Sequence, residues 1–272
     1  MNIQKKLKKQ AVLLCTDKDS PLINIQYNAL KKATIEYADV FIVFHAKETC
    51  IPSFIHNTDH YLFSNSVLTE LGYSPIGGSL LPGNNHFQLL KFYRENPEYE
   101  YYWVIEDDVR FSGDWELFFN SFLTIPSDFI TCCIRHWVEE PGWFWWKLEH
   151  HFKEVPLEKR LRSFNPIYRI SNLALQFINM VLLDGWCGHH EVLLPTLLKY
   201  GGYQVADFGG DSKYVLPGFE NKFYISSKPN SRGILSDGTM KFRPIFNIIG
   251  SEPDKIYHPV KDFYTEEGTL RV

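Results

Sequence analysis

The sequence lacks any long hydrophobic run. Its longest apolar stretches, such as Leu173–Leu183, are interrupted by polar residues including Gln176 and Asn179. A membrane-spanning helix needs about 20 predominantly apolar residues, so the sequence predicts no transmembrane segment. An excess of basic residues is also missing, because 28 Lys and Arg face 32 Asp and Glu, for a net charge of −4. Nucleic-acid-binding domains are usually basic, and this balance argues against nucleic acid as a partner.

The chain contains few cysteine residues, and their number and spacing fit no paired arrangement. The chain has 5 cysteines, an odd number, and none are spaced like metal ligands. This predicts a reduced, cytoplasmic setting and excludes a disulfide framework. The segment Met1–Gln10 is basic but lacks the structure of a signal peptide. We expect it to be a solvated tail, with peripheral contact to anionic lipid at the inner membrane face as the alternative.

Aromatic residues are abundant, at 16% of the chain, and hydrophobic residues make up 44%. A length of 272 residues with this composition predicts a globular protein with a sizeable core. No composition shift or linker divides the chain. We therefore predict a single domain over residues 1–272, with a nucleotide-binding half at 10–125 and an acceptor-binding half at 126–272.

The first half alternates short apolar runs with stretches of helical periodicity. Short runs that are apolar throughout are typical of strands buried on both faces, as in parallel sheets. Four such strands are predicted at Ala11–Cys15, Asp39–Phe44, His60–Ser64 and Tyr101–Ile105. Helices are predicted between them at 22–36, 67–71 and 87–95. This alternation predicts an α/β fold, a mainly parallel twisted sheet flanked by helices with a Rossmann-like first half.

The second half is less regular. A strand is predicted at Phe129–Ile134, followed by a loop rich in tryptophan at Trp137–Trp146. The segment Ile170–Leu183 fits either a helix or a strand followed by a helix. A further helix is predicted at Glu191–Tyr200, and residues 222–272 have the turn formers of coil with short strands.

Three adjacent carboxylates, Glu106, Asp107 and Asp108, directly follow the predicted strand Tyr101–Ile105. Side chains alternate along a strand, so Glu106 and Asp108 should point one way and Asp107 the other. Ligands of parallel sheets bind beyond the carboxyl ends of the strands. Neighbouring carboxylates repel each other, and a hard divalent cation such as Mn²⁺ or Mg²⁺ would offset that repulsion. The alternative is a solvated acidic turn.

The segment Tyr101–Trp115, with its Glu-Asp-Asp motif, resembles the DxD region of nucleotide-sugar glycosyltransferases of the GT-A fold. The resemblance implies a GT-A-like fold and a Mn²⁺ or Mg²⁺ ion that bridges the donor diphosphate. It implies that Asp108 is a metal ligand and that Glu106 and Asp107 contact the donor. It also implies that Thr16 and Asp17 lie near the nucleotide, although an Asp after a strand can equally be a helix cap.

The same resemblance implies roles for residues elsewhere in the chain. It places Asn84 and Lys91 near the donor, with a surface position as the alternative for Lys91. The stretch Gly185–Thr196, which contains Trp186, implies a substrate-contacting turn that leads into a helix. Glu191 in the first turn would be the general base of an inverting enzyme; a carboxylate favoured by the helix dipole is the alternative, with Asp184 and Asp211 as substitute bases.

Near the C-terminus, the resemblance implies that His258 is a further metal ligand and that Lys261 contacts phosphate. The expected activity is transfer of a sugar from a nucleotide-diphosphate sugar to a glycan or glycolipid acceptor, in glycan or surface-polysaccharide synthesis. Two alternatives stay open. One is a nucleotidyltransferase, against which the glycine-free segment Thr16–Ser20 argues. The other is a non-catalytic carbohydrate-binding protein, which the tryptophan-rich segment would suit because sugars stack on indole rings.

Overall fold

The computed structural model describes residues 9–46, 51–228, 230 and 234–261. Most of the basic N-terminal tail, residues 1–8, lies outside the described residues, so its predicted exposure or lipid contact is not addressed. Within the described ranges, no helix has both the length and the apolar character needed to cross a bilayer.

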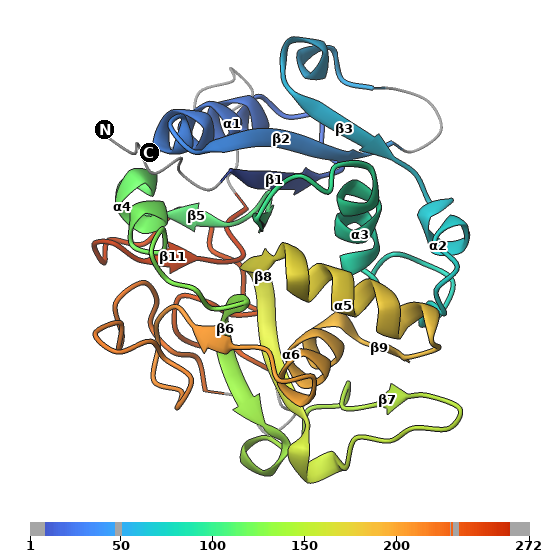
Figure 1. The fold of residues 1–272 in the computed structure, drawn as a ribbon. Coiled ribbons are helices and arrows are strands. Elements are labelled where there is room, and N and C mark those ends of the chain that lie inside the picture. The colour runs from blue at the N-terminus through green and yellow to red at the C-terminus, as the bar shows by residue number, and fades with distance from the viewer. Residues whose placement is uncertain (1–8, 47–50, 229, 231–233, 262–272) are drawn as a thin grey trace, which may run out of the picture.

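A seven-stranded sheet forms the centre of the molecule, in the order β10-β6-β8-β4-β1-β2-β3 (Figure 1). Every pair of neighbours is parallel except the two pairs that contain β8, which is antiparallel to both β4 and β6. This confirms the predicted α/β class with a mainly parallel sheet. The strands are β1 (Gln10–Thr16), β2 (Ala38–His45), β3 (His60–Phe63), β4 (Tyr101–Glu106), β6 (Phe129–His136), β8 (Leu161–Ser171) and β10 (Val205–Asp207).

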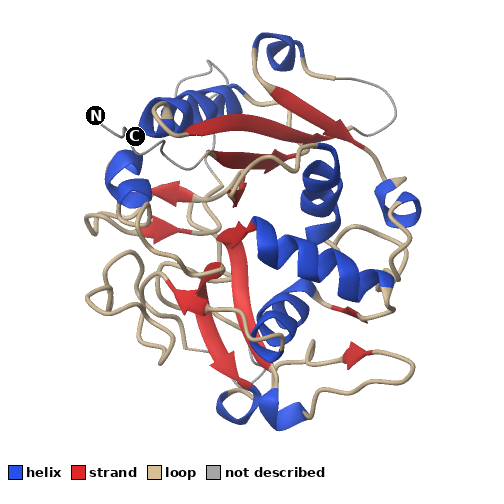
Figure 2. Ribbon diagram, in the orientation of Figure 1, coloured by secondary structure: helices blue, strands red, loops and turns tan. Residues whose placement is uncertain are grey.

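Helices cover both faces of the sheet (Figure 2). In β1, Leu13 faces the core shared with α3 (His86–Glu95), α5 (Asn172–Leu183) and α6 (His190–Tyr200). Its neighbours Val12 and Leu14 face the opposite core, shared with α1 (Pro21–Thr34) and α4 (Trp115–Asn120). Because both faces are buried, the strand is apolar throughout, which is why its sequence lacks alternation. The remaining helices are α2 (Val67–Glu70), η1 (Ser53–Asn57), η2 (Trp137–Glu139) and η3 (Leu157–Lys159).

Strand β8 was not predicted as a full strand. The sequence suggested a helix or a strand followed by a helix at 170–183, whereas the strand occupies Leu161–Ser171 and the helix α5 starts at Asn172. The hydroxyl of Ser171 caps α5 by accepting a hydrogen bond from the amide of Ala174 at 3.1 Å. In the pairing with β4, Ile105 lies opposite Ile167. The first residues of β8 therefore lie beside the acidic end of β4.

Two small sheets lie outside the main one. Strand β7 (Leu148–Glu149) pairs with β9 (Cys187–Gly188), and β5 (Arg110–Phe111) pairs with β11 (Ile256–Tyr257), both antiparallel. Just beyond β11, the amide of Val260 donates to the carbonyl of Asp108 at 2.8 Å. This hydrogen bond holds the chain after β11 against the acidic motif Glu106–Asp108. Strands from both predicted halves share the main sheet, and the functional division at residue 125 stays a prediction.

The tryptophan-rich segment is packed rather than free. Trp143 and Trp146 are each only 6% exposed and form a separate small core with Val192 of α6. Their rings lie edge to face with centroids 5.2 Å apart. Trp145 is partly buried and lies over His189, with the ring centroids 5.1 Å apart. The segment is thus fixed to the start of α6, and that contact matters for the site below.

Candidate functional site

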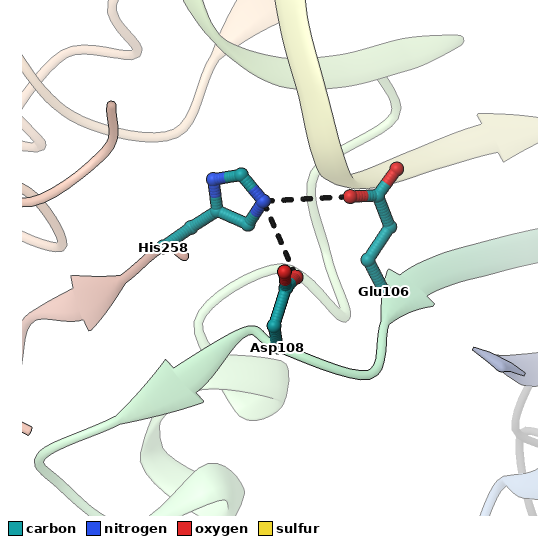
Figure 3. Close-up of side chains that lie close together, drawn as sticks. All are labelled: Glu106, Asp108 and His258. Atoms are coloured by element: carbon teal, nitrogen blue, oxygen red, sulfur yellow. Dashed lines mark ion pairs between the residues drawn. The ribbon is translucent and has the colours of Figure 1, made fainter. Parts of the chain in front are cut away.

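The acidic motif at the end of β4 divides its carboxylates between two directions. Glu106 and Asp108 turn toward the imidazole of His258, as Figure 3 shows. Nε2 of His258 lies 3.4 Å from Oε2 of Glu106 and 3.2 Å from Oδ1 of Asp108. Asp107 turns away, toward β1. The alternation predicted from strand geometry is therefore confirmed, although the strand itself ends at Glu106.

His258 is held with one particular nitrogen facing the carboxylates. Its Nδ1 lies 2.9 Å from the carbonyl oxygen of Lys241, which can only accept a hydrogen bond, so Nδ1 carries the hydrogen. Burial alone would lower the pKa of His258, but Asp108 and Glu106 outweigh it and raise the pKa to about 9. Without a cation, Nε2 is therefore protonated, and binding of a metal ion would displace that proton.

Asp108 is a buried carboxylate in a cationic environment. Burial would raise its pKa, but the neighbouring His258 and Lys261 outweigh this and hold the pKa far below its usual range. Lys261 forms an ion pair with Oδ2 of Asp108, while the buried Oδ1 faces Nε2 of His258 at 3.2 Å. The ligating atoms of Glu106, Asp108 and His258 all lie within 4.8 Å of one another. Two carboxylate oxygens and one imidazole nitrogen fit a divalent cation.

These three residues open onto a cavity of about 420 Å³. The cavity lies at the carboxyl end of β4 and the amino end of the antiparallel β8. The N-terminus of α6 and the C-terminal segment that contains His258 and Lys261 complete its walls. Its lining combines acidic, basic and aromatic side chains. The lining residues that matter below are Asn85, Glu106, Asp108, Phe144, Trp145, Arg162, Asn165, Glu191, Phe242, Arg243, His258 and Lys261.

Glu191 lies in the same cavity, in the first turn of α6. Its amide donates to Nδ1 of His189, the N-cap residue, at 3.3 Å. Its Oε1 accepts a hydrogen bond from the amide of Asn165 at 3.3 Å. Burial raises the pKa of Glu191 to about 7, and Arg162 nearby limits the rise. A carboxyl group with that pKa can take up a proton and release it again near neutral pH, as a general base must.

Two polar cavity residues of β8 were missed by sequence reasoning. Arg162 is 1% exposed and Asn165 is 2% exposed. Nε of Arg162 forms an ion pair with the buried carboxylate of Glu140. Polar residues within a buried strand hide its apolar pattern, and Pro166 further weakens a strand prediction. A usable signal would have been the apolar and β-branched content of residues 167–170.

Three other predicted residues lie at the neighbouring strand ends. Thr16 ends β1, and its hydroxyl donates to Oδ2 of Asp107 at 2.5 Å. Lys18 forms an ion pair with the other carboxylate oxygen of Asp107. Asp17 follows β1 in an exposed position. Thr16, Asp17 and Asp107 do not belong to the lining of the cavity.

The structure does not bring Asn84, Lys91 or Trp186 to the cavity. The side chain of Asn84 is 1% exposed and binds the backbone of the loop at residues 76–79. Its neighbour Asn85 lines the cavity instead, and its amide lies 3.3 Å from Oε1 of Glu106. Lys91 forms ion pairs with Glu70 and Glu95. Trp186 is buried in the helix-covered core.

The substitute bases also lie elsewhere. Asp184 pairs with Lys153 on an exposed turn, and Asp211 pairs with Arg135 at 2.5 Å. Neither aspartate lines the cavity. Of the three carboxylates considered as a general base, Glu191 is the one that lines the same cavity as Glu106, Asp108 and His258.

Comparisons with known proteins leave the family open. No model of a protein family matches the chain, and a search of curated proteins finds no relative. Similar solved structures include a glucosyl-3-phosphoglycerate synthase from Mycobacterium tuberculosis, in complex with Mn²⁺, uridine-diphosphate-glucose and glycerol 3-phosphate. It is 11% identical, with a TM-score of 0.44 over 74% of this chain and 69% of that chain.

A second similar structure is a 4-diphosphocytidyl-2C-methyl-D-erythritol synthase from Anaerococcus prevotii. It is 7% identical, with a TM-score of 0.43 over 76% of this chain and 91% of that chain. At these scores neither likeness carries an argument about activity. The chemistry of the cavity is therefore the basis for assigning a function to this chain.

Proposed function

We propose that this protein is a metal-dependent glycosyltransferase of GT-A-like fold. It would move a sugar from a nucleotide-diphosphate sugar to the hydroxyl of a glycan or glycolipid acceptor. One observation carries the proposal: the triad Glu106, Asp108 and His258 shares a single cavity with the buried carboxyl group of Glu191. A cation site next to a group that can accept a proton near neutral pH supplies both halves of such a transfer.

On the donor side, Asp108, Glu106 and His258 would hold Mn²⁺ or Mg²⁺. Such an ion, when bound, neutralises the charge that develops on the leaving diphosphate. Lys261, already at Asp108, would contact a phosphate oxygen. Thr16, Asp17 and Asp107 at the adjacent strand ends would bind the ribose or base, which fits the place of ligands at the carboxyl ends of parallel strands.

On the acceptor side, Glu191 would remove the proton from the attacking hydroxyl, and direct displacement would invert the anomeric carbon. The amide of Asn165 orients the carboxylate, and burial gives it a pKa suited to the task. The rings of Trp145 and Phe144 line the same cavity. Sugars present apolar C–H faces that pack on such rings. Residues 10–125 would mainly bind the donor, and residues 126–272 mainly the acceptor.

The first test is a thermal-shift screen of UDP, GDP and CMP, each with and without Mn²⁺. A ligand that binds only the folded state raises the melting temperature by mass action. We expect one nucleotide to do so, and only with the metal. Binding of neutral glycans without any effect of nucleotide would instead favour the carbohydrate-binding alternative.

The second test is product analysis with the nucleotide-sugar that the screen selects. A glycosyltransferase releases the nucleoside diphosphate, whereas a nucleotidyltransferase acting in reverse on the same compound with pyrophosphate releases a nucleoside triphosphate. Release of the diphosphate together with an inverted glycosidic bond would support the proposal. A retained configuration would remove Glu191 from the role of base.

A further inference from the structure

Two hydrogen-bond donors in the cavity have no protein partner. They are Nη2 of Arg162 and Nδ2 of Asn165, both buried and both without a hydrogen bond. Both side chains come from the first residues of β8, and both line the cavity. A buried donor left unsatisfied costs stability. Such a pair in a cavity wall therefore points to a ligand that supplies acceptor oxygens.

Both donors are held in fixed orientations. Oδ1 of Asn165 accepts hydrogen bonds from Oγ1 of Thr131 at 2.8 Å and Oγ of Ser163 at 2.7 Å. The amide group therefore turns its nitrogen the other way. Arg162 is held by the ion pair of its Nε with Glu140 and lies over the ring of Trp143, 5.2 Å from the centroid. A ligand would find these donors already oriented.

A second arginine, Arg243, also lines the cavity. Arg243 is exposed and packs against the ring of Phe242, 5.5 Å from the centroid. Across the described ranges it forms no ion pair with an acidic group. The cations on the donor side differ, because Lys261 and His258 already contact Asp108. Arg162 is likewise paired with Glu140, so what it offers a ligand is the unsatisfied Nη2 donor. Among the described residues of the cavity lining, Arg243 is the guanidinium whose charge is not paired.

We propose that the acceptor carries an oxyanion, a carboxylate or a phosphate, which Arg162 and Asn165 bind next to the general base. The name acceptor rests on the proposed function; the oxyanion site does not. Guanidinium groups prefer carboxylate and phosphate oxygens because these bonds are charge-assisted. Since the backbone N–H of Asn165 donates to Glu191, an anchored oxyanion would lie close to the group that deprotonates the attacking hydroxyl.

The test compares matched probes: D-glucuronate, D-glucose 6-phosphate and neutral D-glucose. Trp143 and Trp145 line the cavity, so intrinsic fluorescence reports binding, with calorimetry as a second measurement. We expect at least one anionic probe to bind about tenfold or more tightly than glucose, the size of a charge-assisted hydrogen bond. The preferred probe distinguishes a carboxylate site from a phosphate site.

Three variants localise the effect. Asn165→Asp replaces a donor with a carboxylate oxygen and should abolish the preference for anions. The double variant Arg162→Gln/Glu140→Gln removes a buried ion pair together, which avoids leaving one charge unpaired. Arg243→Gln changes an exposed side chain and should fold in any case, with a loss of about threefold to tenfold in anion affinity. Lys32→Gln, which changes an exposed side chain of α1, is the matched control for the loss of one positive charge.

Equal affinity for the three probes, or an anion preference that persists in Asn165→Asp and Arg243→Gln, would overturn the proposal. The screen with UDP, GDP and Mn²⁺ separates this failure from that of the proposed function. If a nucleotide binds with metal but the probes are not distinguished, the oxyanion site fails alone. If the anionic probes are preferred but no nucleotide binds, the oxyanion site stands and the glycosyltransferase proposal fails.

Discussion

The substitution Glu191→Gln should make the protein less active and more stable. Glutamine keeps the size of the side chain and an oxygen that can accept the amide hydrogen of Asn165. It removes the group that takes the proton from the acceptor. Loss of a general base typically lowers the rate by about 10²- to 10⁴-fold. Donor and metal binding should be unchanged, because Glu191 belongs to neither set of contacts.

The gain in stability follows from the pKa of Glu191. Burial raises it from 4.5 to about 7, so the folded protein holds this proton more tightly than the unfolded chain. Unfolding then releases a proton between these values, and stability falls as the pH rises from about 4.5 to about 7. At about 1.4 kcal/mol for each unit of pKa difference, keeping the carboxylate ionised in the fold costs about 3 kcal/mol at pH 8.

Glutamine avoids that cost, so Glu191→Gln should melt about 5–10 °C above the parent at pH 8 and less than about 3 °C above it at pH 5. Differential scanning calorimetry at both pH values measures this, and Glu220→Gln, at an exposed position, is the control that should show no pH-dependent gap. Transfer by the parent should rise through about pH 7, as Glu191 ionises. A variant that is fully active, or less stable than the parent at pH 8, would refute the reasoning.

Three further predictions use simpler measurements. Asp108→Asn should weaken Mn²⁺ binding by about tenfold or more in calorimetry, since a charged ligand is lost, and should lower the melting temperature, because His258 and Lys261 lose the carboxylate that they pair with; unchanged Mn²⁺ affinity would move the metal elsewhere. Asn84→Ala should cost about 2–3 kcal/mol in denaturant unfolding without altering Mn²⁺ affinity, because its side chain binds a loop backbone. Lys91→Met should change neither nucleotide nor metal binding, since its exposed ion pairs contribute little; a weaker nucleotide shift would return Lys91 to the donor site.

Much of the sheet could be predicted because its strands are uniformly buried. Strands β1, β2 and β4 show continuous apolar runs, and the acidic motif ends β4 where the sequence placed it. Asp107 and Asp108 point in opposite directions, as strand alternation predicts, although both lie in the turn that follows β4. These features depend on short stretches of local sequence, so one amino-acid sequence is enough to predict them.

Arg162 and Asn165 could not be predicted because several of their partners are distant in sequence. Arg162 contacts Glu140 and Trp143, and Asn165 accepts a hydrogen bond from Thr131. No local pattern reveals such pairings. The choice between Asn84 and Asn85 likewise depends on which one the loop at residues 76–79 captures. Only the folded chain decides between two adjacent residues of the same type.

The antiparallel pairing of β8 with β4 fixes the distance between the acidic end of β4 and the cavity residues of β8. With Ile105 opposite Ile167, the spacing from the end of β4 to the start of β8 does not depend on the length of chain that joins them. Insertions in the exposed segment 151–154 would therefore leave that spacing unchanged. A slip of one residue in that pairing would turn Asn165 to the opposite face. Diversification of such a scaffold is therefore expected in its connecting segments, with the pairing itself held invariant.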